Sequence, residues 1–291
     1  MPGLDGKTCV ITGATSGIGL ATAERLCAMG ARLVLVGRDP VKGEAALARV
    51  KARAPGSAVV MLYADLSRLD EVRRLAAALR DAAPRIDVLI NNAGGIFRRR
   101  SETVDGLERT FALNHMAYYV LTRLVADCVV AAAPARIVNV ASTAHRGASL
   151  DFADLQAARS YDGWTAYRRS KLCNILFTCE LSRRLAGTGV TANSLHPGFV
   201  ASRFGDENDG VFRWGLTIAK RFAAISTEAG AATPAYLASA PEVAATTGLY
   251  FDKCRAVAPS QAAQDDAAAV RLWYESARMA RLPDEGAGRL P

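Results

Sequence analysis

The stretch "KTCVITGATSGIG", residues 7–19, decides the fold, because a short apolar run leads directly into three closely spaced glycines. Its first six residues indicate a buried strand, and the residues from about 17 to 29 have helical periodicity. Glycines at such a turn let the backbone approach a pyrophosphate, while the helix N-terminus supplies amides and a positive dipole. The spacing is G-x-x-x-G-x-G rather than the generic G-x-G-x-x-G, and glycine clusters also mark plain strand-to-helix turns. The glycines are Gly13, Gly17 and Gly19.

The same alternation of strand and helix continues along the chain. Apolar runs of strand length lie at 7–12, 31–37, 57–63, 86–91, 135–142, 190–196 and 247–251. Helical patterns lie between or after them at about 17–29, 40–53, 67–82, 106–132, 164–186 and 262–280. Strands that are apolar on both faces and separated by helices pair in parallel. We therefore predict an α/β fold, a doubly wound (Rossmann) parallel sheet of about seven strands with helices on both faces.

The chain shows no internal repeat and no low-complexity linker, so we expect a single domain over 1–282 and a flexible polar tail at 283–291. The segment 198–225 interrupts the alternation and is predicted to be a substrate-binding lid. Its apolar side chains could line a pocket, or equally belong to a helix packed on its own core. These side chains are Trp214, Leu216, Ile218 and Phe222.

Composition limits the classes of protein. The chain has 291 residues, of which 51% are hydrophobic and 22% charged, as suits a globular protein with a full core. Its six cysteines have no CxxC or Cys/His ligand spacing, so we expect reduced thiols in a cytoplasmic protein and no metal site. The N-terminus leads straight into a strand, and no stretch approaches the roughly 20 apolar residues that span a bilayer. We expect no membrane span.

The net charge of +8 requires an anionic partner to be considered. The basic residues are scattered, and the one run, 98–100, lacks the interleaved aromatic residues that stack on bases. We therefore expect no nucleic-acid binding. Attraction of a phosphorylated cofactor or an acidic substrate is the simpler use of the charge.

The end of the second strand, "LVLVGRD", bears on which cofactor is bound. Where a ribose 2′-hydroxyl would be bound by an acidic residue, this chain has Gly37 followed by Arg38. A guanidinium there could hold a 2′-phosphate through charge-assisted hydrogen bonds. Alternatively, Arg38 lies on the surface beside Asp39, a residue suited to cap the next helix. We favour the first interpretation, and with it NADP(H) over NAD(H).

Two further strand ends carry candidate cofactor residues. Asp65 could accept a hydrogen bond from an adenine amino group, or cap a helix that begins near Ser67. The small residues of "NNAG" (91–94) suit a backbone that lies close to a cofactor. Structural support of the sheet is an equally good interpretation for Asn91 and Asn92.

Candidate chemical groups gather at the other end of the predicted crevice. Ser142 ends the fifth strand, while Tyr167 and Lys171, one turn apart, open the helix that leads to the sixth. Ligands of such sheets bind outside the carboxyl ends of the strands, where these side chains should meet. A Tyr–Lys pair is common by chance, and lysine can extend its ammonium to water. A phenol with a pKa near 10 is, however, a useful base at neutral pH only if a neighbouring ammonium favours the phenolate.

These motifs together resemble the classical short-chain dehydrogenase/reductase family. The resemblance rests on "TGATSGIG", "NNAG", Asn114, Ser142, "YRRSK" and "HPG", which follow in order over nearly the whole chain. It implies that Tyr167 is the general acid or base and that Lys171 favours the phenolate and bonds the nicotinamide ribose. It also implies that Ser142 holds the substrate oxygen. Asn114, if its side chain follows the inward face of its helix, would order a water that links Lys171 to bulk solvent.

The resemblance also implies a set of cofactor contacts. They are Gly13, Thr15, Ser16, Gly17, Ile18, Gly19, Arg38, Asp65, Leu66, Asn92, Ala93, Gly94, Tyr167, Lys171, Pro197 and Gly198.

Within the family the chain is most similar to the retinol dehydrogenase group. The similarity lies in "GRDPVKGEAAL", "STAH", the run from "SKLCNILF" to "HPG", and the 25-residue interval between Ser142 and Tyr167. It implies NADP(H)-dependent interconversion of a lipophilic aldehyde or ketone and its alcohol. Membrane-bound relatives carry an N-terminal hydrophobic anchor, which this sequence does not show.

Two alternatives to that activity stay open. One is reduction of a carbon–carbon double bond, as in protochlorophyllide reductase-like relatives. The other is a catalytically idle NADP-binding sensor or scaffold, although such proteins typically lose the tyrosine or the lysine.

We also expect a homodimer or homotetramer, because the helices at 106–132 and 164–186 have apolar residues left over for a partner. Alternatively, the stretch "FTCELSRRL" (177–185) packs within the subunit.

Overall fold

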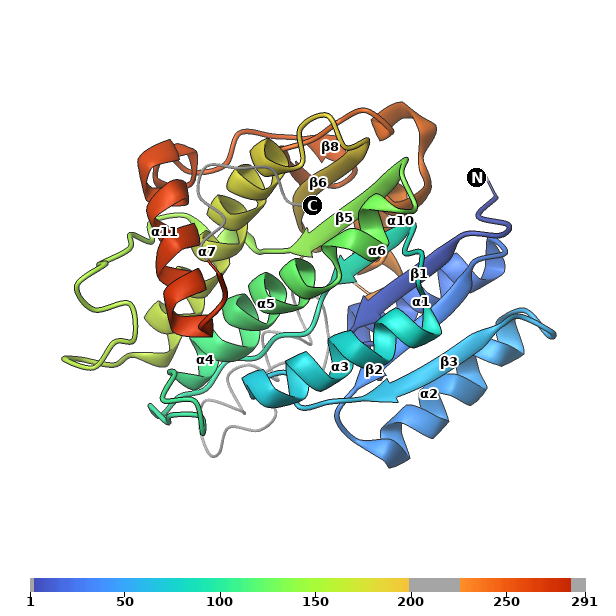
Figure 1. The fold of residues 1–291 in the computed structure, drawn as a ribbon, viewed down its shortest axis with the longest axis horizontal. Coiled ribbons are helices and arrows are strands. Elements are labelled where there is room, and N and C mark those ends of the chain that lie inside the picture. Colours follow the sequence, from blue (N-terminus) through green and yellow to red (C-terminus); the bar gives the residue numbers. More distant parts are fainter. Residues whose placement is uncertain (1–2, 199–225, 284–291) are drawn as a thin grey trace.

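A single eight-stranded sheet forms the centre of the computed structural model, which describes residues 3–198 and 226–283 (Figure 1). The strands are β1 (Thr8–Thr12), β2 (Arg32–Gly37), β3 (Val59–Tyr63), β4 (Val88–Asn91), β5 (Ala135–Val140), β6 (Val190–His196), β7 (Tyr250–Asp252) and β8 (Arg255–Ala256). Their order is β3-β2-β1-β4-β5-β6-β7-β8. The first seven are parallel, and β8 pairs antiparallel with β7. The predicted single-domain Rossmann sheet is confirmed, with a short antiparallel edge strand added.

Helices cover both faces of the sheet, as a parallel sheet that is buried on both faces requires (Figure 1). They are α1 (Gly17–Ala28), α2 (Pro40–Arg53), α3 (Leu69–Ala82), α4 (Arg109–Phe111), α5 (Ala117–Leu124), α6 (Ala126–Val130), α7 (Gly163–Arg184), α9 (Thr227–Gly230), α10 (Ala232–Ser239) and α11 (Asp266–Ala280). One core lies between the sheet and α1, α2 and α10. The other lies between the sheet and α3, α5 and α7, and it includes the buried face of α11, which packs on α7.

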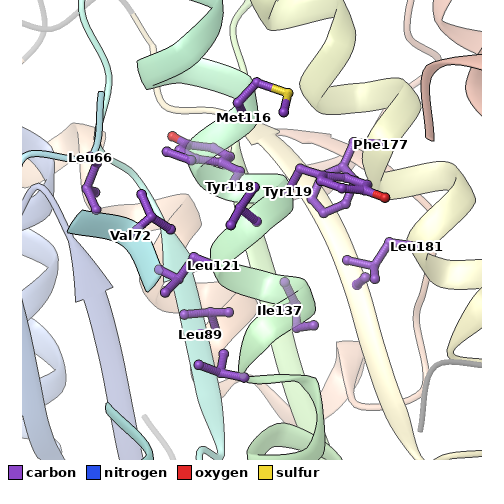
Figure 2. Packing of buried hydrophobic residues seen from close by; sticks show 14 of the residues in the cluster. Leu66, Val72, Leu89, Met116, Tyr118, Tyr119, Leu121, Ile137, Phe177 and Leu181 are labelled. Carbon is purple, nitrogen blue, oxygen red and sulfur yellow. The ribbon is translucent and has the colours of Figure 1, made fainter. Parts of the chain in front are cut away.

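Alternate residues of a strand therefore enter different cores. In β1, Val10 faces the core under α3 and α5, while Cys9 and Ile11 face the core under α1 and α2. On α5, the neighbouring Tyr118 and Tyr119 point to opposite sides (Figure 2), the first toward the α3 side and the second toward α7. All five side chains are at most 1% exposed.

The single helix predicted at 106–132 is wrong. The chain is helical without interruption from α4 through a π-helical turn (Ala112–Met116) to the end of α5, and it breaks at Val125 before α6. At this break, the Leu124 carbonyl accepts a hydrogen bond of 3.2 Å from Arg80 Nε of α3. A hydrogen bond between a backbone carbonyl and a side chain of another helix cannot be predicted from the local pattern of apolar residues.

The apolar face of α7 is covered by α11 of the same chain (Figure 1). Trp273 of α11 is 2% exposed. Its ring centre lies 5.0 Å from that of Tyr119 and 5.9 Å from that of Phe177, and the Arg184 guanidinium stacks on it at 4.3 Å. Phe177 and Leu181 are both buried. These two residues of the stretch 177–185 therefore pack within the subunit rather than against a partner. The oligomeric state itself stays a prediction.

A row of polar side chains crosses the centre of the sheet beneath α5 and α7. Asn91 of β4 donates to Asn139 Oδ1 of β5 at 2.9 Å and to Thr122 Oγ1 of α5 at 3.0 Å. Asn139 in turn donates to Thr178 Oγ1 of α7 at 2.9 Å. These four side chains are fully buried, so Asn91 supports the sheet and has no access to a ligand.

The predicted lid at 198–225 and tail at 283–291 lie outside the described residues, apart from Gly198 and Pro283. Where the chain is described, none of its helices combines the length and the apolar character needed to span a membrane.

Candidate active site

A cavity of about 720 Å³ opens at the carboxyl ends of β1, β2, β4, β5 and β6. Its volume is in the range of cofactor and ligand pockets. All the residues that the sequence predicted to contact a cofactor line it. They are Gly13, Thr15, Ser16, Gly17, Ile18, Gly19, Arg38, Asp65, Leu66, Asn92, Ala93, Gly94, Tyr167, Lys171, Pro197 and Gly198.

The loop after β1 is shaped by its glycines. Gly13 and Gly17 have φ angles of +67° and +57°, which other residues rarely adopt. A Cβ atom on Gly19 would lie 2.3 Å from the Gly13 oxygen and 2.5 Å from Asn92 Nδ2. Asn92 holds this loop, because its Nδ2 donates to Thr12 O at 2.8 Å and to Gly13 O at 3.2 Å. Asn92 thus both supports the structure and lines the cavity.

The N-terminus of α1 suits a pyrophosphate. Its N-cap residue, Ser16, makes no side-chain cap bond, and the first turn has no acidic residue. By contrast, the N-termini of α2 and α7 are capped by Asp39 and Asp162. The residues 16–19 line the cavity, so the amides and the positive dipole of this 12-residue helix are available to an anion there. The residues present therefore fit a dinucleotide.

Both interpretations of the β2 end describe part of the structure. Asp39 caps α2 by accepting from the amides of Val41 at 3.0 Å and Lys42 at 3.2 Å. Arg38 nevertheless lines the cavity, and so does Lys42, whose Nζ lies 3.4 Å from Asp39 Oδ2. The sequence analysis missed Lys42, although a basic residue in the first turn of this helix is a recognisable signal.

Asp65 also has a structural role. Its Oδ1 accepts from the amide of Ser67 at 3.0 Å and from the Ser67 hydroxyl at 2.8 Å, while the residue lines the cavity. The helix begins at Leu69 rather than near Ser67, and the Leu69 amide is bound by Asp105 Oδ2 at 2.9 Å. Asp65 therefore shapes the turn before α3.

Tyr167, Lys171 and Ser142 meet at the other end of the cavity. Tyr167 and Lys171 lie one turn apart on α7 and are 8% and 3% exposed. The Lys171 Nζ donates to the Val140 carbonyl at 3.0 Å and lies 5.7 Å from the centre of the Tyr167 ring. Ser142, two residues beyond β5, is hydrogen-bonded to Tyr167. The spacing on α7 and the end of β5 bring together the three groups that the sequence singled out.

Asn114 lies behind this group, in the π-helical turn. It is fully buried. Its Oδ1 accepts a hydrogen bond from the Gly95 backbone amide at 2.8 Å, and its Nδ2 donates to the Gly95 carbonyl at 2.9 Å. It also donates to Ser170 Oγ at 2.9 Å. A Cβ atom on Gly94 would lie 3.1 Å from Asn114 Oδ1 and 3.5 Å from Lys171 Nζ. Asn114 thus faces the same small space as Lys171 without lining the cavity.

Burial determines the charge states of Tyr167 and Lys171. It raises the pKa of Tyr167 to about 12, with the hydrogen bond from Ser142 acting in the opposite direction. It lowers the pKa of Lys171 to about 7. Lys171 is thus not what sets the pKa of Tyr167 in this structure, because the loss of water outweighs other effects. The neutral phenol is the form that can donate a proton.

The lowered pKa of Lys171 makes the stability of the cofactor-free protein depend on pH. Between about pH 7 and the ordinary value of 10.5, the unfolded chain keeps a proton that the folded chain has lost, so stability rises with pH. From pH 7 to pH 9 this group should add about 2 kcal/mol. Lys171→Met should remove that rise, as measured by urea unfolding at the two pH values. If the free energy of unfolding rose equally with pH in the wild type and in Lys171→Met, the lowered pKa of Lys171 would not be its cause.

The cavity has apolar walls that the sequence analysis did not single out. They are formed by Ile96, Phe97, Leu113 and Trp164. The Trp164 ring stacks on that of Tyr167, with centres 5.6 Å apart and planes at 30°. A Cβ atom on Gly163 would lie 2.3 Å from the Phe97 oxygen, so this glycine lets α7 begin against the wall. The position of Trp164, three residues before Tyr167 on one helix, was an available signal.

The described residues, 3–198 and 226–283, contain no group of three or more His, Cys, Asp or Glu side chains placed to hold a metal ion. All six cysteines lie in these ranges and are free thiols.

Comparisons with known proteins agree with this fold. The family model for short chain dehydrogenases matches residues 7–209. Retinol dehydrogenase 13 of Homo sapiens is 40% identical over 284 residues, which cover 96% of this chain and 86% of the relative. Retinol dehydrogenase 12 of Mus musculus is 38% identical over 276 residues, covering 95% and 87%.

Solved structures show the same similarity. An uncharacterized protein from Mycobacterium paratuberculosis has a TM-score of 0.77 and 32% identity, covering 100% of this chain and 97% of its own. The RhlG/NADP active-site complex from Pseudomonas aeruginosa has a TM-score of 0.68 and 25% identity, covering 86% and 95%.

A Rossmann sheet whose cavity joins an uncapped helix N-terminus to a Tyr–Lys pair is typical of nicotinamide-dependent oxidoreductases. Within that class, the chain belongs to the short-chain dehydrogenase family and is retinol dehydrogenase-like. It is therefore an enzyme of a family whose members bind a nicotinamide cofactor and act on an alcohol or carbonyl group.

Proposed function

We propose that the protein is an NADP(H)-dependent oxidoreductase that interconverts a lipophilic aldehyde or ketone and its alcohol, with Tyr167 as general acid and base. The observation that carries the proposal is the meeting of the buried Tyr167 and Lys171 with Ser142 in the cavity that also contains the N-terminus of α1. The names of the retinol dehydrogenase relatives support an alcohol or aldehyde as the substrate.

The chain's own residues would bind the cofactor and handle the proton. The glycine loop and the α1 N-terminus would hold the pyrophosphate. Arg38 would hold a 2′-phosphate, and Pro197 and Gly198 would line the nicotinamide end. A bound nicotinamide supplies or accepts the hydride at the carbonyl carbon.

In the direction of reduction, the neutral Tyr167 phenol donates its proton to the carbonyl oxygen as negative charge develops there. The Ser142 hydroxyl, already bonded to Tyr167, holds that oxygen by a hydrogen bond. In its protonated form, which a pKa of about 7 leaves partly populated at neutral pH, Lys171 then stabilises the phenolate that remains. Asn114, which faces the same space as Lys171, would order a water through which the proton is replaced.

The preference for NADP(H) rests on the two cations at the end of β2. Arg38 and Lys42 both line the cavity, and a guanidinium binds a phosphate through strong, charge-assisted hydrogen bonds. Two of the similar solved structures, at 25% identity, are complexes with NADP by their titles.

Replacing Arg38 with alanine should raise the Kd for NADPH about 10- to 100-fold and leave that for NADH within about threefold, because only NADPH carries the 2′-phosphate. Binding is measured by the fluorescence of the reduced nicotinamide. Lys51→Ala, at an exposed position of α2 outside the cavity, is the matched control. An equal loss for both cofactors would show that Arg38 does not select between them.

Purified protein should be tested with NADPH and NADH against a panel of lipophilic aldehydes and ketones. Turnover with NADPH that increases with the apolar character of the substrate would support the proposal, because Ile96, Phe97, Leu113 and Trp164 form apolar walls. Turnover only with enones would favour the carbon–carbon double-bond reductase. Tight binding of NADPH without any turnover would favour the idle sensor.

The cytoplasmic location and the homodimer or homotetramer belong to the proposal as well. The free state of all six cysteines supports a reducing compartment. Gel filtration with light scattering tests the oligomeric state.

A further inference from the structure

Ser142 belongs to a small turn rather than to the strand itself. It lies two residues beyond β5 and caps a 3₁₀ turn (Thr143–His145), with its Oγ accepting from the Ala144 amide at 3.1 Å. The direction of the Ser142 hydroxyl therefore depends on how this turn is held. Any group that fixes the turn also fixes Ser142 relative to Tyr167.

His145 holds the turn from one side. It is fully buried; its Nδ1 lies 2.6 Å from the Ser142 carbonyl oxygen, and its Nε2 lies 3.0 Å from the Ser260 amide nitrogen. An amide can only donate, so Nε2 accepts and carries no proton. Nδ1 must then carry the proton and donate to the Ser142 carbonyl. Both ring nitrogens are thus bonded in one neutral tautomer.

The surroundings of His145 favour that neutral form. Burial has the largest effect on the pKa of the His145 imidazole and lowers it; the hydrogen bond to the Ser142 carbonyl acts in the opposite direction, and the neighbouring Arg146 lowers the pKa further. The ring meets Tyr250 of β7 edge to face, with centres 5.1 Å apart. The side chain joins the end of β5 to a segment 115 residues away in the sequence.

Arg168 holds the turn from the other side. It follows Tyr167 on α7 and donates to the carbonyls of Ala144 at 3.3 Å and Arg146 at 2.9 Å. The helix that carries Tyr167, α7, is thus hydrogen-bonded to the turn that follows Ser142. Together with His145, it leaves the turn bonded to α7 on one side and to the 258–260 segment on the other.

We propose that His145 is a positioning residue, which fixes the Ser142 carbonyl and thereby holds the Ser142 hydroxyl opposite Tyr167. The proposal rests on the proposed function, since it assumes that Ser142 holds the substrate oxygen. His145 does not line the cavity, so it acts only through Ser142. The bond from Nδ1 to the Ser142 carbonyl carries the effect, and the bond from Ser260 orients the ring.

Three replacements of His145 separate these bonds. The side-chain amide of His145→Asn can place a donor near the position of Nδ1, while that of His145→Gln reaches toward Nε2; His145→Leu restores neither. We expect kcat to fall about 10- to 100-fold in the Leu and Gln variants, the loss that a misplaced catalytic group produces, with the Kd for NADPH unchanged. The Asn variant should keep kcat within about threefold of wild type.

Tyr250→Phe is the matched control. It keeps the ring against His145 and removes only a buried hydroxyl that has no hydrogen-bond partner among the described residues. Its kcat should equal that of the wild type. A wild-type kcat in His145→Leu would overturn the proposal. The proposal would also be overturned if kcat fell equally in the Leu, Gln and Asn variants and the size of the fall depended only on how far Tm was lowered.

A second readout needs no turnover and separates this proposal from the proposed function. In ¹⁵N NMR spectra, His145 should show a protonated Nδ1 and an unprotonated Nε2 at pH 7. The Ala144 amide should exchange slowly in wild type and in His145→Asn, and faster in His145→Gln and His145→Leu. If the wild type reduces no substrate, the proposed function fails while these spectra still decide the role of His145. The opposite tautomer, or Ala144 exchange at one rate in all four proteins, would refute it.

Discussion

Replacing Tyr167 with phenylalanine should lower kcat/KM for carbonyl reduction about 10²- to 10⁴-fold, the usual contribution of a general acid. The variant loses one oxygen atom and keeps the ring that stacks on Trp164. The Kd for NADPH should therefore change less than about threefold, and the loss should lie in kcat rather than in KM. Stopped-flow and steady-state assays of the same preparation separate these quantities.

Tyr236→Phe provides the control for this experiment. Tyr236 lies on α10, outside the cavity, so the same change of atoms there should leave both kcat and Kd at their wild-type values. A Tyr167→Phe enzyme that retains turnover within a few-fold of wild type would exclude Tyr167 as the proton donor. Loss of cofactor binding together with turnover would instead indicate that the replacement disturbs the cavity.

Replacing Trp273 with alanine should lower the free energy of unfolding by about 3–5 kcal/mol. The indole is 2% exposed and fills the space between α5, α7 and α11. It touches the rings of Tyr119 and Phe177, and the Arg184 guanidinium stacks on it. Removing it leaves a cavity and exposes the apolar face of α7.

Two other variants calibrate this loss, which is measured by urea unfolding. Trp273→Phe should cost less than half as much, because a smaller ring still fills most of the space. Trp164→Ala removes the same number of atoms from a side chain that is 48% exposed and should cost under about 1 kcal/mol. A loss below 1 kcal/mol for Trp273→Ala would show that α11 does not stabilise the domain through this contact.

Most of the sheet could be predicted because its signals are local. The strands β1 to β5 are mostly apolar runs of four to six residues, and the helices carry their own periodicity. The errors fall where a distant residue decides. A helix that looks continuous in sequence ends at Leu124, whose carbonyl accepts a hydrogen bond from Arg80 of another helix. β8 has only two residues, both exposed, and exists through its pairing with β7.

The candidate site follows the same division. Tyr167 and Lys171 could be found because one helical turn separates them, and Ser142 because it ends a strand. The environment that sets the pKa values of Tyr167 and Lys171 could not be predicted from the sequence, because burial depends on all the elements packed around them. The hydrogen bond between His145 and the Ser260 amide joins residues 115 positions apart, and no sequence pattern near "STAH" predicts it.

The buried pair of Asn91 and Asn139 has a consequence for how the chain finds its alignment. The two asparagines are direct partners across β4 and β5, and their amides bond to each other and to threonines of α5 and α7. A slip of one residue between these strands would turn one amide toward the apolar core on the opposite side of the sheet. The amides stranded in this way would cost about 1–3 kcal/mol each. Misaligned intermediates of the sheet are thus rejected at its centre during folding, before any ligand can select the correct form.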